Sequence, residues 1–175
     1  MTTKPMPGSN APALNLPLAG GGTYDLSAQS PDAATMVIFY RGYHCPVCKD
    51  YLAKVTAKAG EFAEKGMPIV LVSMDEEERA KKAKEEWGLQ DLDVAYGLTE
   101  DQARAWGLYV TTSIKEVEIP VFNEPGTFWV KADGTLYLID IASMPFARPD
   151  VDILLGRVGA IGAGYPARGT RAEAA

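Results

Sequence analysis

A strand-like segment that leads into a cysteine pair, and then into a helical pattern, limits this chain to few architectures. The apolar run 36–40 precedes Cys45-Pro46-Val47-Cys48, and these two cysteines are the only ones among the 175 residues. A Cys-x-x-Cys at a strand-to-helix junction, in a chain without other cysteines, is typical of a redox dithiol. Two cysteines are too few for a disulfide-stapled scaffold, so we expect a reducing, cytoplasmic compartment.

Charge and hydropathy exclude several classes of partner. The formal net charge is −6, which argues against binding to nucleic acid or to an anionic membrane surface, because both attract basic proteins. No apolar run approaches the roughly 18 residues of a membrane-spanning helix. Residues 1–10 are polar and lack the apolar core of a secretory signal, so we expect none.

The hydrophobic pattern predicts a single α/β domain over residues 1–175, with an extended arm at 1–12 and an irregular tail at 163–175. A central mixed sheet flanked by helices, with an N-terminal β-hairpin, fits the order of elements. Strands are predicted at 14–18, 24–26, 36–40, 69–72, 94–96, 127–130 and 135–141. Helices are predicted at 46–65 and 76–87, from Thr99 and from Asp150. Residues 111–124 are predicted to be a loop.

The helix start predicts different roles for the two cysteines. Cys45 would occupy the N-cap and Pro46 the first helical position, where proline is favoured because its missing N–H has no helical partner. Backbone N–H groups and the helix dipole would then stabilise a Cys45 thiolate. Cys48, one turn further in, would be more buried and less acidic. We therefore expect Cys45 to be the accessible nucleophile and Cys48 the resolving thiol.

Other interpretations of the cysteines and their neighbours are weaker or stay open. Two buried structural cysteines are one alternative. Zinc would need a second ligand pair, and c-type haem would need histidine where Lys49 stands, so no metal and no cofactor is predicted. His44 could lower the pKa of Cys45 or move a proton, or it could simply fill space. Arg41 could stabilise the thiolate or form a surface ion pair.

Much of the chain, from about Ala13 to Ala142, resembles the alkyl hydroperoxide reductase and thiol-specific antioxidant group, a peroxiredoxin-like branch of the thioredoxin-fold superfamily. The resemblance rests on residues 39–48, 72–75, 106–108 and 126–134, and 144–149 is similar to peroxiredoxin-like sequences. It implies a thioredoxin-like fold and a redox activity with an antioxidant role.

Within that resemblance the active-site positions differ from the peroxidase pattern Pro-x-x-x-Thr-x-x-Cys. Arg41 stands at the proline, Cys45 at the threonine, and Cys48 in the register of the peroxidatic cysteine. Pro125 occupies the place of the family's later arginine. Because threonine and arginine polarise the peroxide, the resemblance predicts slower reaction with peroxides than with disulfides.

A loop before a late strand resembles the cis-proline loop of the thioredoxin fold. In Glu124-Pro125-Gly126-Thr127, the Glu124–Pro125 bond is predicted to be cis and to face the dithiol, where it would help to bind substrate. Arg41 and His44 are predicted to complete the substrate site. Phe39 stands where thioredoxins carry a buried aspartate, which leaves the proton acceptor for Cys48 unidentified.

These observations predict a thiol–disulfide oxidoreductase that uses Cys45 and Cys48. A thiol-dependent peroxidase acting on hydrogen peroxide or alkyl hydroperoxides is the first alternative. A redox-switched binding module is the second, because the apolar segment 144–146 could contact a partner or form a homodimer. Expected partners are protein or small disulfides, peroxides and a thiol electron donor, with no nucleic acid and no membrane.

Overall fold

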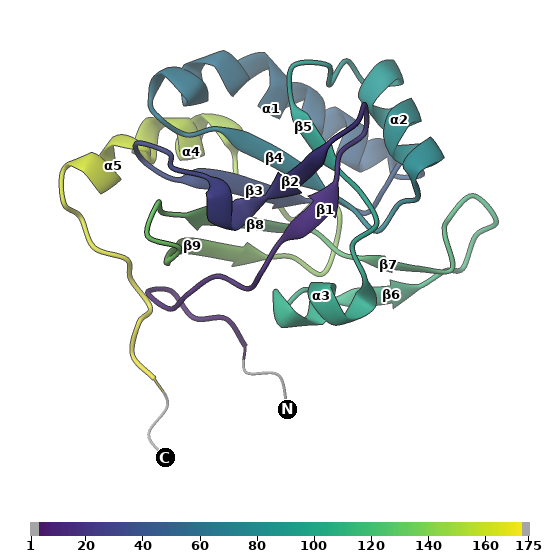
Figure 1. Ribbon diagram of the computed structural model, residues 1–175. Helices are drawn as coiled ribbons and strands as arrows, with labels where there is room; N and C mark the ends of the chain where they lie inside the picture. Colours follow the sequence, from purple (N-terminus) through teal and green to yellow (C-terminus); the bar gives the residue numbers. More distant parts are fainter. Residues whose placement is uncertain (1–3, 173–175) are drawn as a thin grey trace.

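A five-stranded mixed sheet forms the centre of the computed structural model, which describes residues 4–172 (Figure 1). Its strands lie in the order β5-β4-β3-β8-β9. Their bounds are Thr35–Phe39 for β3, Ile69–Val72 for β4, Asp93–Ala95 for β5, Gly126–Val130 for β8 and Leu136–Ile141 for β9. β3, β4 and β5 are parallel, whereas β8 and β9 run antiparallel to their neighbours. The predicted mixed sheet is therefore confirmed.

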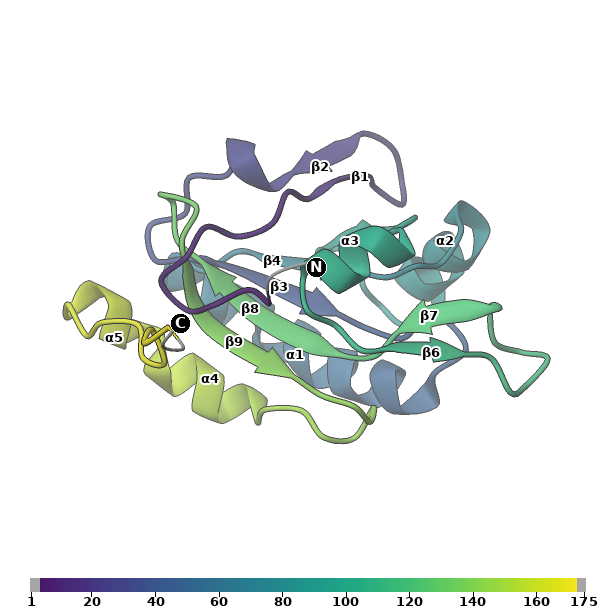
Figure 2. The same ribbon diagram turned by 90° about the horizontal axis from the view of Figure 1, so that it is seen from below.

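Alternate residues of β3 divide the core into two halves, because successive side chains of a strand point to opposite faces. Met36 and Ile38 pack with α1 (Pro46–Glu64) and α4 (Val151–Arg157), and Tyr40 follows them on the same face. Val37 and Phe39 pack on the other face, with α3 (Glu100–Ala105) and the hairpin of β1 (Asn15–Pro17) and β2 (Thr23–Asp25). Figure 2 shows α1 and α4 below the sheet, and α3 with the hairpin above it. α2 (Glu77–Glu86) adds Ala80 to the α1 side.

Local signals in the sequence set several element boundaries as predicted. Thr99 caps α3 through a reciprocal capping box with Gln102, and Asp150 caps α4 by accepting the N–H of Ile153. Gly20, Gly21 and Gly22 all have positive φ between β1 and β2, a turn that side chains would strain. The turn at residues 133–134 joins β8 to β9.

The predicted loop at 111–124 is wrong, because it contains most of a second hairpin. β6 (Val110–Thr112) pairs antiparallel with β7 (Val121–Asn123) as a separate two-stranded sheet. Each strand has three residues, too few for an alternating pattern to be recognised. Two further short elements, η1 (Leu26–Ala28) and α5 (Gly159–Gly162), were also not predicted.

The bond between Glu124 and Pro125 is trans, so the predicted cis-proline is wrong. The chain runs here from β7 into β8, and both Glu124 and Pro125 make backbone hydrogen bonds to adjacent segments. Glu124 N donates to Tyr109 O at 2.8 Å, and Ala142 N donates to Pro125 O at 3.0 Å. No tight reversal is required, and trans is the ordinary form of the bond before proline.

The predicted arm follows β9, because Ser9 O accepts the N–H of Leu136 and Ala11 N donates to Gly134 O. The first residues of this arm, 1–3, and the last of the predicted tail, 173–175, lie outside the described residues. Within residues 4–172, no helix is both long and apolar enough to cross a membrane.

Candidate functional site

The loop between β3 and α1 is fixed by two hydrogen bonds to other segments and by one within the loop. Asn123 Nδ2 donates to Tyr40 O at 3.2 Å, and Tyr43 N donates to Asp75 Oδ2 at 2.7 Å. Cys45 N donates to Gly42 O at 3.1 Å. Gly42 has φ +127°, and a Cβ there would lie 2.6 Å from Asp75 Oδ1. Only glycine therefore fits this bend, which brings Cys45 to the start of α1.

Cys45 occupies the N-cap of α1 and Pro46 follows at the first turn, as predicted. The Sγ atom of Cys45 accepts the N–H of Cys48 at 3.2 Å. Cys45 is 1% exposed and Cys48 is 0% exposed, so the predicted greater accessibility of Cys45 is wrong. The cause is packing, because both cysteines lie in the apolar cluster between α1 and the sheet. Both are free thiols here.

The two thiols differ in acidity. A hydrogen bond from the Cys48 thiol lowers the pKa of Cys45 to about 6, with help from the Cys48 N–H and the charges of Arg41 and Arg148, although burial opposes them. Burial raises the pKa of Cys48, and the hydrogen bond that it donates to Cys45 raises it further. Cys45 is therefore the more acidic thiol of the pair.

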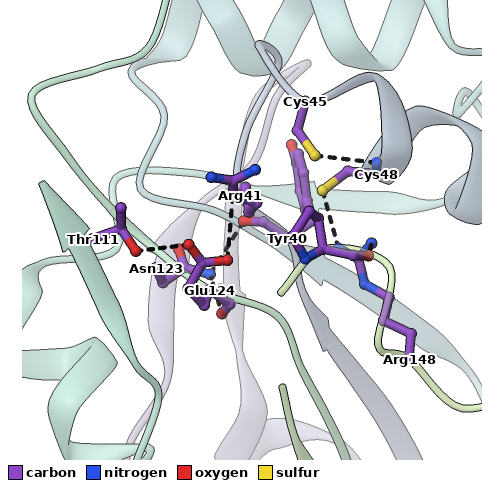
Figure 3. A network of polar contacts seen from close by, with 9 residues as sticks. Tyr40, Arg41, Cys45, Cys48, Thr111, Asn123, Glu124 and Arg148 are labelled. Atoms are coloured by element: carbon purple, nitrogen blue, oxygen red, sulfur yellow. Dashed lines mark hydrogen bonds and ion pairs between the residues drawn. The ribbon is translucent and has the colours of Figure 1, made fainter. Parts of the chain in front are cut away.

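Arg148, from the segment that follows β9, contacts the second thiol (Figure 3). Its Nη2 donates to Cys48 Sγ at 3.0 Å and its Nη1 donates to Pro145 O at 2.7 Å. The guanidinium also lies over the Tyr51 ring, 4.9 Å from its centroid. Sequence reasoning missed Arg148. Its only signal was that residues 144–149 are similar to peroxiredoxin-like sequences. Arg148 thus places an arginine beside the dithiol, although Pro125 stands where an arginine was expected from the resemblance.

Arg41, which is half-buried, forms an ion pair with the buried Glu124, with Arg41 Nε 3.3 Å from Glu124 Oε2 (Figure 3). Thr111 Oγ1 donates to the other carboxylate oxygen at 2.6 Å, and Glu124 is only 5% exposed. Arg41 also lies over the Phe122 ring, 4.8 Å from its centroid. An ion pair is thus present, but with a buried partner and not at the surface as predicted, and the charge of Arg41 also helps to lower the pKa of Cys45. Glu124 already has two partners, which limits its freedom to bind substrate.

His44 packs against Phe122 with ring centroids 4.7 Å apart. Neither ring nitrogen has a hydrogen-bond partner among residues 4–172. Burial and then the charge of Arg41 lower the pKa of His44 to about 4. The ring is therefore neutral near pH 7, which favours the space-filling interpretation over stabilisation of the thiolate by charge.

A buried carboxyl group that sequence reasoning did not assign lies behind the loop. Asp75 follows β4, is fully buried, and has a pKa raised by burial to about 6. Burial also raises the pKa of Tyr40, and the neighbouring Asp75 carboxyl group raises it further. Within residues 4–172, no group of three His, Cys, Asp or Glu side chains could hold a metal ion.

Comparison with known proteins gives one family. The AhpC/TSA family model matches residues 7–139. A Mycobacterium tuberculosis protein named "Putative peroxiredoxin" is 30% identical over 112 residues, which are 62% of this chain and 68% of that protein.

Two solved structures share the fold. Peroxidoxin BcpB from Mycobacterium tuberculosis has 22% identity and a TM-score of 0.73, covering 90% of this chain and 98% of its own. A peroxiredoxin-like protein from Aquifex aeolicus has 16% identity and a TM-score of 0.74, covering 91% and 89%. The predicted thioredoxin-like fold is thereby confirmed.

Proposed function

The chain belongs to the AhpC/TSA family of thiol-dependent, peroxidase-like redox enzymes, and on that premise we propose that Cys45 and Cys48 are its working dithiol. Electrons would pass from an external thiol to a hydroperoxide through a disulfide between the two cysteines. The observation that carries the proposal is the pair of sulfur contacts, Cys48 N–H to Cys45 Sγ at 3.2 Å and Arg148 Nη2 to Cys48 Sγ at 3.0 Å.

In the first step the Cys45 thiolate attacks the outer oxygen of the hydroperoxide. The O–O bond breaks, Cys45 becomes a sulfenic acid, and the alkoxide or hydroxide leaves with a proton as alcohol or water. Arg41 and Arg148 supply positive charge beside the site where charge develops on the leaving oxygen. Because Cys45 is buried in the reduced protein, this step requires the loop 41–45 to open.

In the second step Cys48 attacks the sulfur of the Cys45 sulfenic acid. The S–O bond breaks, water leaves, and the Cys45–Cys48 disulfide forms. Once Cys45 is neutral, Cys48 no longer faces a negative sulfur, whereas Arg148 is still beside it. A nearby guanidinium favours the thiolate form, so Cys48 gains its reactivity after Cys45 has reacted.

Disulfide reduction is a second candidate, favoured by the lowered pKa of Cys45. A thiolate at a helix N-terminus is the nucleophile that thiol–disulfide exchange needs. The two activities use the same dithiol and differ in the oxidant. The sequence predicts that peroxides oxidise the reduced protein more slowly than disulfides do. The rate constants of the two reactions, measured with the same protein, test that prediction.

Stopped-flow oxidation of the reduced protein tests the proposal, with hydrogen peroxide, an alkyl hydroperoxide and a small neutral disulfide as oxidants. The expected product of each peroxide reaction is a protein that has lost two hydrogen atoms and that regains them with a thiol. Oxidation that leaves the two cysteines unlinked in the mass spectrum would contradict the proposed dithiol. The Lys65→Gln variant, altered at the far end of α1, is the control.

The setting of this activity is also part of the proposal. We expect a reducing cytoplasm, where a thiol donor can return the disulfide to the dithiol. A homodimer or another partner would use Met144 and Phe146, which are 48% and 71% exposed. Sedimentation of the reduced and oxidised protein checks the homodimer, and a monomer in both states would contradict it.

A further inference from the structure

A pocket of about 530 Å³ lies beside the loop that carries Cys45. His44 and Pro46, the immediate neighbours of Cys45, and Tyr43 belong to its lining. A second hollow of about 290 Å³ lies beside Arg148 and shares no lining residue with the first. The two hollows use different faces of α1, since Pro46 and Lys49 line the first, whereas residues 47, 50, 51 and 54 line the second. The first hollow is therefore next to the chain neighbours of Cys45, and the second is next to Arg148, the residue that contacts Cys48.

The pocket beside Cys45 is positively charged in a chain of net charge −6. Lys49, Arg79 and Lys82 line it together with a single carboxylate, Glu86. That carboxylate accepts the hydroxyl of Tyr43 at 2.6 Å. His44 adds no charge near neutral pH. The pocket thus attracts anions where most of the surface repels them.

The walls of this pocket are held in place by contacts between separate elements. The rings of Tyr43 and Trp87 stack with centroids 5.9 Å apart and planes 19° apart. Arg79, from α2, donates to Val117 O in the β6–β7 hairpin at 3.0 Å. A flat aromatic wall and a bridged rim form a concave site, and its volume lies in the range of small-molecule pockets.

The chemistry of the disulfide indicates which reactant belongs on this side. A thiolate that attacks Cys45 expels Cys48, and Cys48 leaves beside the Arg148 guanidinium. Attack on Cys48 would instead expel Cys45. His44 and Pro46, which flank Cys45 in the chain, line the first pocket, so a thiol bound there would meet Cys45 first.

We propose that the pocket lined by Lys49, Arg79 and Lys82 binds the reductant, a small thiol that carries carboxylate groups. The inference rests on the proposed dithiol chemistry and adds the class of electron donor. The carboxylates lie against the cationic side chains, and the thiol lies next to the loop 41–45. Opening of that loop then exposes Cys45 to the bound thiol.

The reaction balances as two exchanges. The first thiolate bonds to Cys45 Sγ, the Cys45–Cys48 bond breaks, and Cys48 leaves as a thiolate that takes up a proton. A second molecule of the thiol attacks the sulfur of the first, and the Cys45 thiolate leaves. Two thiols are oxidised to one disulfide, and the protein disulfide is reduced to two thiols.

The test measures reduction of the disulfide form by three small thiols: mercaptosuccinate, which is anionic, 2-mercaptoethanol, which is neutral, and cysteamine, which is cationic. The disulfide is made with diamide rather than peroxide, so the result does not depend on peroxidase activity. Each rate constant is divided by that of the same thiol with hydroxyethyl disulfide, which corrects for intrinsic reactivity. Mercaptosuccinate is expected to be favoured about fivefold or more over 2-mercaptoethanol, and less so at high salt.

Two variants locate the effect. Lys49→Gln and Lys82→Gln should each slow reduction of the disulfide by mercaptosuccinate by roughly threefold. Reduction by 2-mercaptoethanol should keep the same rate. Lys65→Gln removes the same charge from the far end of α1, outside both hollows, and should change neither. Equal slowing by Lys65→Gln, or no preference for mercaptosuccinate, would overturn the proposal. If Lys49→Gln or Lys82→Gln slowed oxidation by an anionic hydroperoxide but not reduction by mercaptosuccinate, the proposal would also be overturned. The pocket would then bind the oxidant and not the reductant.

Discussion

Cys45 and Cys48 are one helical turn apart, yet different parts of the chain create their environments. Cys45 ends a loop and accepts hydrogen bonds from Cys48, its own helical neighbour. Cys48 lies inside α1 and meets Arg148, which is 100 positions away in the chain. The acidity of the first thiol thus comes chiefly from a hydrogen bond donated by its helical neighbour Cys48, whereas the charge beside the second comes from the tertiary fold. A neighbour one turn away can prepare the nucleophile, but the second thiol needs a residue from a distant segment.

The largest effect should come from replacing each of the two cysteines, one at a time, with serine. Cys45→Ser is expected to lose reaction with peroxide and disulfide by about a thousandfold or more, because the nucleophile is removed. Cys48→Ser should still react once and then accumulate a mixed disulfide or a sulfenic acid. Intact-mass spectrometry after a single turnover distinguishes these products.

The reverse pattern would exchange the roles of the cysteines. If Cys45→Ser kept rapid peroxide consumption, Cys48 would be the nucleophile, as its register in the family suggests. The double variant Cys45→Ser/Cys48→Ser serves as the background for both measurements.

A smaller effect is expected when the charge beside Cys48 is removed. Arg148→Met should slow closure of the Cys45–Cys48 disulfide by about tenfold or more, because a hydrogen bond from a charged donor is lost. The initial loss of the Cys45 thiolate should change less. Rapid-quench mass spectrometry separates the two phases.

Arg157→Met provides the matched control, because Arg157 is an exposed residue of α4. Equal slowing in both variants would mean that overall charge, and not the contact with Cys48, governs closure. Partial rescue by Arg148→Lys would support a role for charge over geometry.

The hydrogen bond between the thiols should appear as a shift in pH dependence. Wild-type Cys45 has a pKa of about 6, so its thiolate fraction rises as the pH passes through that value. Cys48→Ala removes the largest stabilising contact, and the inflection should move upward by about one pH unit. Ultraviolet absorbance of the thiolate measures the inflection. Cys48→Ser retains a hydroxyl donor and should lie nearer to wild type, whereas identical curves for Ala and Ser would contradict the hydrogen bond.

The same contrast explains what the sequence could predict. Strands 69–72 and 127–130, the caps at Thr99 and Asp150, and the N-cap position of Cys45 depend on residues close in the chain. Their spacing therefore predicts them.

What the sequence could not predict depends on distant contacts or on very short elements. Arg148 reaches Cys48 only because β9 returns the chain to α1, and no spacing rule encodes that distance. β6 and β7 have three residues each, and the buried surroundings of Cys45 come from packing between layers. The trans bond at Pro125 follows from strand pairings on both sides of it, which a motif resemblance does not contain.

The loop that carries Cys45 also depends on a buried carboxyl group, which gives the smallest and most indirect prediction. Asp75 accepts the N–H of Tyr43, and its pKa is raised in the folded protein to about 6 from an ordinary 3.8. The native state then binds more protons than the unfolded state between these values, so the free energy of unfolding falls as the pH rises from 4 to 6. The contribution is on the order of 3 kcal/mol.

Asp75→Asn should remove that slope while it keeps an acceptor for Tyr43. Urea unfolding at a series of pH values from 4 to 7 measures the difference between wild type and variant, which should change in favour of the variant as the pH rises. Asp91→Asn, at an exposed position, is the control. Parallel stability curves for wild type and Asp75→Asn would show that the carboxyl group is not protonated on burial. The anchor of the Cys45 loop would then be a charged one, as the Arg148 contact of Cys48 is.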